Sequence, residues 1–140
     1  MTEVNPQELA ARYVAVWTES DPRVRRDTIR ELWSEGGRHI IQAPEEILKV
    51  AADVGFSSAS LEARGYDSLE VRVSRAYEEF VAPGEFTFRP RGTAQRLNDI
   101  VKLRWEMVPV GGGEAAGVGL DVLVLGEDGR INIDYQFIES

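Results

Sequence analysis

One carboxylate lies inside the most apolar segment of the chain, GVGLDVLVL at positions 117–125. A carboxylate that loses its water holds a proton more readily, so it can take a proton from carbon and return it near neutral pH. Asp121 is therefore a candidate general acid or base for enolisation beside a carbonyl group. The alternative follows from strand alternation: if its branched neighbours face the core, Asp121 faces outward, with Lys102 and Arg104 as cross-strand partners.

His39 is the only histidine in the chain and is the second candidate for proton transfer. An imidazole titrates near neutral pH, so it can carry a proton or donate a hydrogen bond to a ligand. The alternative is a histidine on a strand that is bonded to a backbone group and has no chemical role.

The motifs of several cofactor-dependent classes are missing. The chain has no G-x-S-x-G segment, no Walker glycine loop, no pair of histidines at metal spacing and no cysteine. The glycine run Gly111–Gly113 precedes neither a lysine nor a helical pattern, so it predicts a hairpin loop. We therefore expect no cofactor and no metal.

Length and charge limit the partners. A chain of 140 residues is the usual size of one domain, so we expect a single domain over 1–140. The net charge of −8 repels phosphate backbones and anionic membranes, and no apolar run approaches the roughly 20 residues that span a bilayer. We expect no nucleic acid and no membrane. The N-terminus has no signal-peptide pattern, which indicates a cytoplasmic protein.

Helical spacing dominates the first 80 residues or so. Asn5 followed by Pro6 predicts a helix over about 6–19, and a second helix runs from Pro22 to the glycine pair at 36 and 37. A short strand is expected at 38–42. Further helices are predicted from Pro44 to near Gly55 and from Asp67 to Phe80.

Beyond Gly84 the apolar period changes from helical to alternating. Strands are predicted from Phe86, over 101–107 and over 131–137, each with one apolar and one polar face. In the last strand the apolar face is Ile131, Ile133, Tyr135 and Phe137. Asp128 and Gly129 predict a tight hairpin before it. The fold class is therefore α+β, with helices first and an antiparallel sheet after them.

The strand at 118–125 differs because both of its faces are apolar. Leu120, Val122 and Val124 form one face, and Leu123 and Leu125 form the other beside Asp121. Something must cover the second face. A homodimer packed sheet against sheet would do so, and a helix of the same chain would serve equally well.

The order of elements resembles the nuclear-transport-factor-2-like (cystatin-like cone) superfamily. The stretches ARYVAVWTESDPRVRRDTIRELWSEGGRHI, VKLRWEMV and GLDVLVLGEDGRI are similar to its SnoaL-like polyketide cyclase branch. The resemblance implies a curved antiparallel sheet wrapped around the N-terminal helices to form a cone with an internal pocket. Matching positions place five aromatic residues around that pocket, with solid core packing as the alternative: Tyr13, Trp17, Trp33, Trp105 and Tyr135.

The resemblance also implies a chemistry. Catalytic relatives carry an acid on the strand of Asp121, and cyclases and isomerases of this kind need no cofactor. Where relatives have a second aspartate two residues after the position of His39, this chain has Ile41. The two hypotheses are thus a cofactor-independent cyclase or isomerase using Asp121 and His39, and a non-catalytic module that binds a small apolar molecule or dimerises.

Overall fold

The computed structural model describes residues 4–57 and 59–139. The helices are α1 (Pro6–Thr18), α2 (Pro22–Leu32), α3 (Glu45–Asp53) and α4 (Tyr66–Ala76), which continues as a π-helical turn, η1 (Tyr77–Val81). The strands are β1 (Trp33–Gln42), β2 (Ser60–Arg64), β3 (Phe86–Leu97), β4 (Ile100–Pro109), β5 (Gly117–Leu125) and β6 (Ile131–Glu139). None of the described helices has the length and apolar character needed to cross a membrane.

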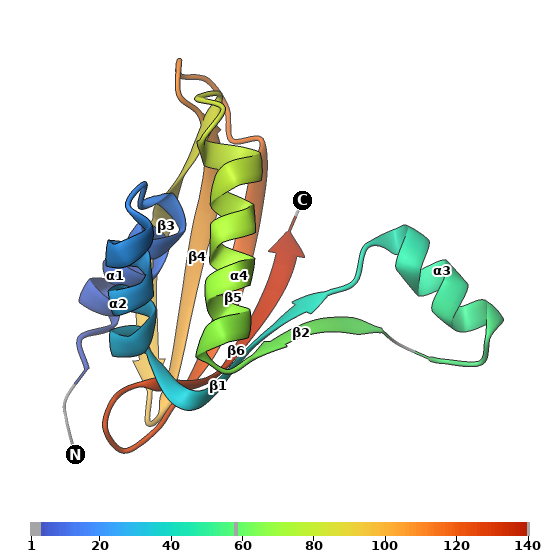
Figure 1. Ribbon diagram of the computed structural model, residues 1–140, viewed down its shortest axis with the longest axis horizontal. Coiled ribbons are helices and arrows are strands. Elements are labelled where there is room, and N and C mark those ends of the chain that lie inside the picture. The colour runs from blue at the N-terminus through green and yellow to red at the C-terminus, as the bar shows by residue number, and fades with distance from the viewer. Residues whose placement is uncertain (1–3, 58, 140) are drawn as a thin grey trace.

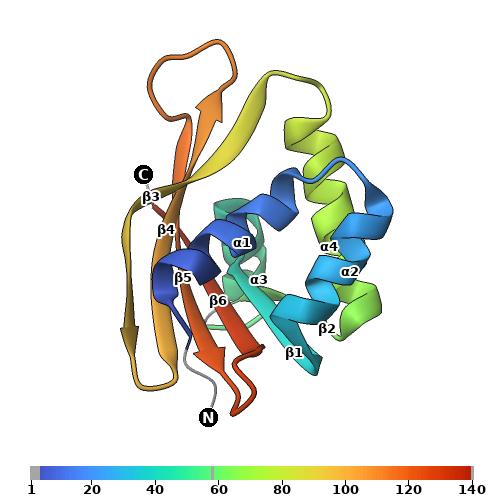
Figure 2. The ribbon, with the colours of Figure 1, turned by 90° about the vertical axis from the view of Figure 1, so that its left-hand side faces the viewer.

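The six strands form one curved, open sheet in the order β2-β1-β6-β5-β4-β3. Helices α1, α2 and α4 lie together on one side of it (Figure 2). The predicted α+β class, with a curved sheet wrapped around the first helices, is confirmed. One pairing corrects the expectation of a purely antiparallel sheet, because β1 runs parallel to its neighbour β6. The long chain segment between these two strands permits that arrangement.

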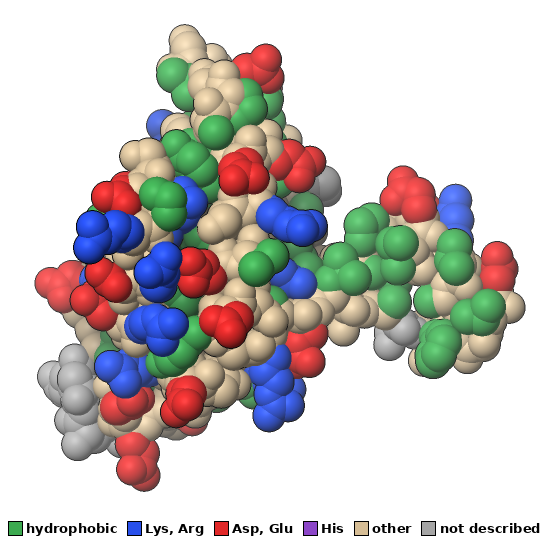
Figure 3. All heavy atoms as spheres, viewed as in Figure 1, with side chains coloured by type: hydrophobic (Ala, Val, Ile, Leu, Met, Phe, Trp, Pro, Cys, Tyr) green, Lys and Arg blue, Asp and Glu red, His purple; other side chains and the backbone are tan. Residues whose placement is uncertain are grey.

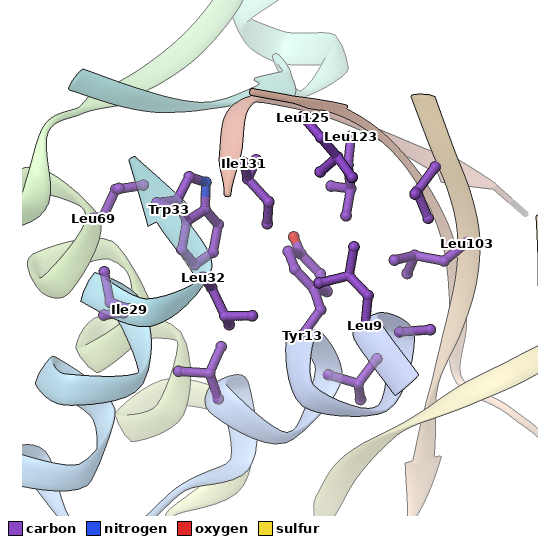
Figure 4. Close-up of a cluster of buried hydrophobic side chains, with 14 of the residues drawn as sticks. Leu9, Tyr13, Ile29, Leu32, Trp33, Leu69, Leu103, Leu123, Leu125 and Ile131 are labelled. Atoms are coloured by element: carbon purple, nitrogen blue, oxygen red, sulfur yellow. The ribbon is translucent and has the colours of Figure 1, made fainter. Parts of the chain in front are cut away.

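The core lies between the helices and the inner face of the sheet (Figure 4). Helix α1 begins as predicted, since the side chain of Asn5 accepts hydrogen bonds from the backbone N–H groups of Gln7 and Glu8. Its buried side chains, led by Leu9 and Tyr13, meet Leu103 and other residues of the central strands. These apolar contacts fix α1 against the sheet and set the position of every group on its inner side.

The glycine pair at 36 and 37 does not end α2, which is a correction to the predicted boundary. The helix ends at Leu32, and Trp33 already belongs to β1, opposite Ile131 of β6. A Cβ atom on Gly37 would lie 2.9 Å from both the Trp33 ring and the Ser34 carbonyl oxygen. Glycine is needed there for close packing inside an irregular strand rather than to stop a helix.

Strand β2 was not predicted, because its sequence SLEAR has no apolar alternation and four of its five residues are exposed. With β1 it forms a hairpin that carries α3 away from the body (Figure 1). None of the nine residues of α3 is buried. Apolar side chains are therefore exposed on this arm, as its green surface in Figure 3 shows, among them Ile47, Val50 and Val54.

Candidate functional site

A cavity of about 490 Å³ lies between α1, α4 and the inner face of the sheet. Most of its wall is aromatic or aliphatic. The aromatic residues are Tyr13, Trp17, Phe80, Phe88 and Trp105, and the larger aliphatic residues are Ile41, Leu61, Met107, Val118 and Ile138. Three polar side chains also line it: His39, Arg72 and Gln136.

Three of the five aromatic residues that were expected around the pocket line the cavity: Tyr13, Trp17 and Trp105. Trp33 does not, because it is fully enclosed in the core, with its ring centre 5.7 Å from that of Tyr13. Tyr135 does not either, since it is 38% exposed on the opposite face of the sheet. The expectation for Trp33 and Tyr135 was therefore wrong.

A bulge in β6 explains the position of Tyr135. Val124 of β5 pairs with Ile133, whereas the next residue, Leu125, pairs with Ile131, so Asn132 is an extra residue in β6. A one-residue insertion moves all later side chains to the other face. Beyond the bulge, Asp134 and Gln136 point inward. Tyr135 and Phe137, which were expected to belong to an inward apolar face, point outward.

Asp121 points into the protein, which decides between the two orientations that its sequence allowed. It is fully buried, on the same face of β5 as Leu123. Its carboxylate accepts hydrogen bonds from the Tyr13 hydroxyl at 2.8 Å and from the Trp105 indole N–H at 2.7 Å. The outward alternative is excluded, and Arg104 instead pairs with Glu139.

A second buried acid, Asp134, completes a cluster with Tyr13 and Asp121. The Tyr13 hydroxyl oxygen lies 2.5 Å from Asp134 Oδ2 and 2.8 Å from Asp121 Oδ2. A hydroxyl has one proton to donate, so the second contact is a hydrogen bond only if one carboxyl group is protonated. Burial, and then the neighbouring charge of Asp121, raise the pKa of Asp134 well above its usual value. Asp134 therefore keeps its proton to higher pH than an exposed aspartate does.

His39 is enclosed beside this cluster and bonded at both ring nitrogens. Arg72 Nη1 lies 2.9 Å from Nδ1, and the Gln136 side-chain oxygen lies 2.8 Å from Nε2. Because arginine can only donate, Nδ1 is the acceptor and Nε2 carries the proton. Burial lowers the pKa of His39, with the Arg72 charge acting in the same direction, so the ring is neutral at pH 7.

His39, Asp121 and Asp134 each offer one ligand atom, and the three atoms lie within 4.8 Å of one another. These are the described residues that could hold a metal ion. Most of these ligand atoms already make hydrogen bonds, however: the Tyr13 hydroxyl bridges the two carboxyl groups, and His39 Nε2 carries a proton, while Asp134 Oδ1 has no partner among the described residues. The Arg72 guanidinium beside the ring adds a positive charge. The arrangement fits a shared proton better than a cation.

Sequence reasoning missed Asp134, Gln136 and Arg72. The signal for Arg72 is its place in α4, where it interrupts an apolar stripe between the buried residues Leu69 and Val73. Asp134 and Gln136 alternate as regularly as the apolar residues beside them, and no pattern in the strand locates the bulge that turns them inward.

Neither a family model nor a curated protein matches the chain. Solved structures do match. The crystal structure of a "putative isomerase of the SnoaL-like family" from Agrobacterium tumefaciens has a TM-score of 0.76 at 20% identity, covering 98% of this chain and all of that one. A SnoaL-like protein of unknown function from Burkholderia thailandensis has a TM-score of 0.58 at 18% identity, covering 96% of this chain and 97% of that one. The chain has the SnoaL-like, NTF2-like fold.

An NTF2-like protein of unknown function from Mesorhizobium loti matches over a similar extent, with a TM-score of 0.59 at 14% identity and coverage of 99% and 98%. At these identities the likeness carries the SnoaL-like fold and no reaction, because one fold supports many activities. What this chain does depends on its own cavity and acid cluster.

Proposed function

We propose that this chain binds a small, mainly apolar molecule in its cavity. The observation that carries the proposal is the cavity of about 490 Å³ with apolar walls and three polar side chains. Small-molecule sites are typically concave, of about 300–1,000 Å³, and lined by apolar residues with a few polar groups that orient the ligand. The cavity has these properties.

Naphthalene is a suitable probe, with equilibrium dialysis and ultraviolet absorbance as the measurement. Ala76 lines the cavity, so Ala76→Phe should fill it and abolish binding. Its neighbour Arg75 is exposed, and Arg75→Phe adds the same ring outside the cavity as a control. Equal binding by both variants would place the probe elsewhere and contradict the proposal.

The second candidate is cofactor-independent proton transfer of the isomerase or cyclase type. It is favoured by the cluster of Tyr13, Asp121 and Asp134, which places the exchangeable Tyr13 hydroxyl between two acids at the cavity wall. It also agrees with the isomerase description of the Agrobacterium tumefaciens protein. Both carboxyl groups are fully buried, so the proton would pass to the ligand through Tyr13.

Deuterium exchange tests this candidate without a known substrate. The methyl protons of 2-acetylnaphthalene in D₂O should exchange faster with the protein than without it, and Asp121→Asn should remove the acceleration. Binding of the ketone with no accelerated exchange would leave the chain as a binding module only.

We also propose a homodimer through the outer face of the sheet. Helices α1, α2 and α4 all cover the inner face (Figure 2), so no described helix of the chain covers the apolar outer face of β5. On that face Tyr135 and Phe137 of β6 are 38% and 41% exposed, beside Val122 and Leu120. A second copy would bury this surface. On sequence evidence we further propose one domain over 1–140 and a cytoplasmic location.

A further inference from the structure

A directed row of hydrogen bonds runs along the polar part of the cavity wall, from Arg72 through His39 to Gln136. The proton on His39 Nε2 is fixed by the bond from Arg72, and it is donated to the side-chain oxygen of Gln136 at 2.8 Å. The amide oxygen of Gln136 is therefore occupied. Its NH₂ group has no partner among the described residues and belongs to a side chain that lines the cavity.

Arg72 adds a positive charge to the same wall. Its Nη1, which has two hydrogens to donate, lies 2.9 Å from the His39 ring and from the His39 carbonyl oxygen, and 3.2 Å from the Leu61 carbonyl oxygen. These are its hydrogen-bond partners in the part of the chain described, and none is a carboxylate. Burial lowers the pKa of Arg72, and the neighbouring acids Asp134 and Glu62 act in the opposite direction.

The cavity wall thus offers donors and a positive charge but no open acceptor. No carboxylate lines the cavity among the described residues, and the Gln136 oxygen accepts from His39. A ligand oxygen with negative charge would pair with both donors, and such charge-assisted hydrogen bonds are roughly twice as strong as neutral ones.

We propose that the cavity takes an apolar molecule that carries a carboxylate, with the Arg72 guanidinium and the Gln136 amide as donors to its oxygens. This deepens the proposed function and rests on it. The apolar body of the ligand occupies the part of the cavity walled by Phe80, Phe88 and Trp105.

Three probes of one shape test the proposal: 2-naphthoate, 2-acetylnaphthalene and 2-ethylnaphthalene, measured by equilibrium dialysis at pH 7.5. We expect the acid to bind at least about tenfold more tightly than the ketone, because a charge-assisted hydrogen bond is stronger than a neutral one by about that factor. Gln136→Glu keeps the shape of the side chain and replaces the donor with a negative charge. It should weaken 2-naphthoate at least about tenfold and leave 2-ethylnaphthalene within about twofold.

Arg72→Lys gives a second variant that keeps a charge but loses the planar donor geometry, and it should weaken the acid more than the hydrocarbon. Equal affinity for all three probes, unchanged by Gln136→Glu, would contradict the proposal that the ligand carries a carboxylate. The proposal of an apolar binding site would still stand. Preference for the ketone over the acid would overturn it as well. If none of the three binds, the proposed function itself fails.

Discussion

Polar and apolar side chains are divided unusually between the two faces of β5 and β6, although the inner face also holds the buried Leu123, Leu125 and Ile131. On the inner face lie Asp121, Asp134 and Gln136, fully or largely enclosed, whereas the outer face has Val122 opposite the half-exposed Tyr135. Polar groups are retained inside only where each finds a partner, and apolar groups outside leave surface in water. The inner face thus holds the hydrogen-bonded cluster of Tyr13, Asp121 and Asp134, and the outer face leaves apolar surface that the proposed second copy would bury.

The largest effect is expected from Asp121→Ala. It removes the acceptor of the Trp105 N–H and of the Tyr13 hydroxyl and leaves a void, so the free energy of unfolding should fall by about 3–5 kcal/mol. Leu120→Ala, one residue away on the outer face, should cost less than about 1 kcal/mol in the monomer. Urea unfolding of dilute protein measures both. Similar losses would remove the distinction between the faces.

A methyl group on the inner face should have the next largest effect. A Cβ atom on Gly119 would lie 2.1 Å from the Trp105 ring, so Gly119→Ala must displace the indole and weaken its bond to Asp121. The cost should be about 1–3 kcal/mol, with a shift in tryptophan fluorescence. Gly117→Ala is the control, since a Cβ atom there meets nothing within 4 Å. Equal stability of the two variants would show that Trp105 is not held in place.

Asp134 should make stability depend on pH. Its pKa is raised in the folded protein above the unfolded value near 3.8, so the folded state binds more protons. The stabilisation is complete below pH 3.8 and is lost as the pH rises through the folded pKa, with a slope of at most about 1.4 kcal/mol per pH unit for one proton. Asp134→Asn has no proton to lose, so the unfolding free energy of the native chain should fall relative to the variant as pH rises. Parallel profiles from urea unfolding would contradict a protonated Asp134.

The smallest effect on folding, but a clear one on assembly, is expected from Val122→Glu on the outer face. The new carboxylate lies opposite Lys102, so the stability of the monomer should change by no more than about 0.5 kcal/mol. Light scattering should show a dimer for the native chain and a monomer for the variant. Gln95→Glu adds the same charge beside the same lysine on β3 and should leave the dimer intact. A native monomer at high micromolar concentration would disprove the homodimer.

Local patterns predicted the elements well but not how they meet. The alternation in 101–107 and the turn at Asp128 and Gly129 fix β4 and the last hairpin without reference to the rest of the chain. The site was predicted in part: Tyr13 and Trp105 do line the cavity, while Tyr135 lies outside. Periodicity states that a strand has two unlike faces, and it does not state which face is inside.

The sequence by itself determined the presence of the helices, the cap of α1, most of the strands and the presence of an acid in an apolar strand, because these depend on residues a few positions apart. The capping pair expected at Asp67 and Glu70 is not formed, since α4 begins at Tyr66 with no side-chain cap. Only the tertiary structure decided that Asp121 faces inward and that Asp134 joins it. Tyr13, which bridges them, is 108 and 121 residues away along the chain. The bulge at Asn132 that turns Asp134 inward depends on the pairing of β6 with β5. Such pairing is set by the packing of the whole sheet, which no local pattern encodes.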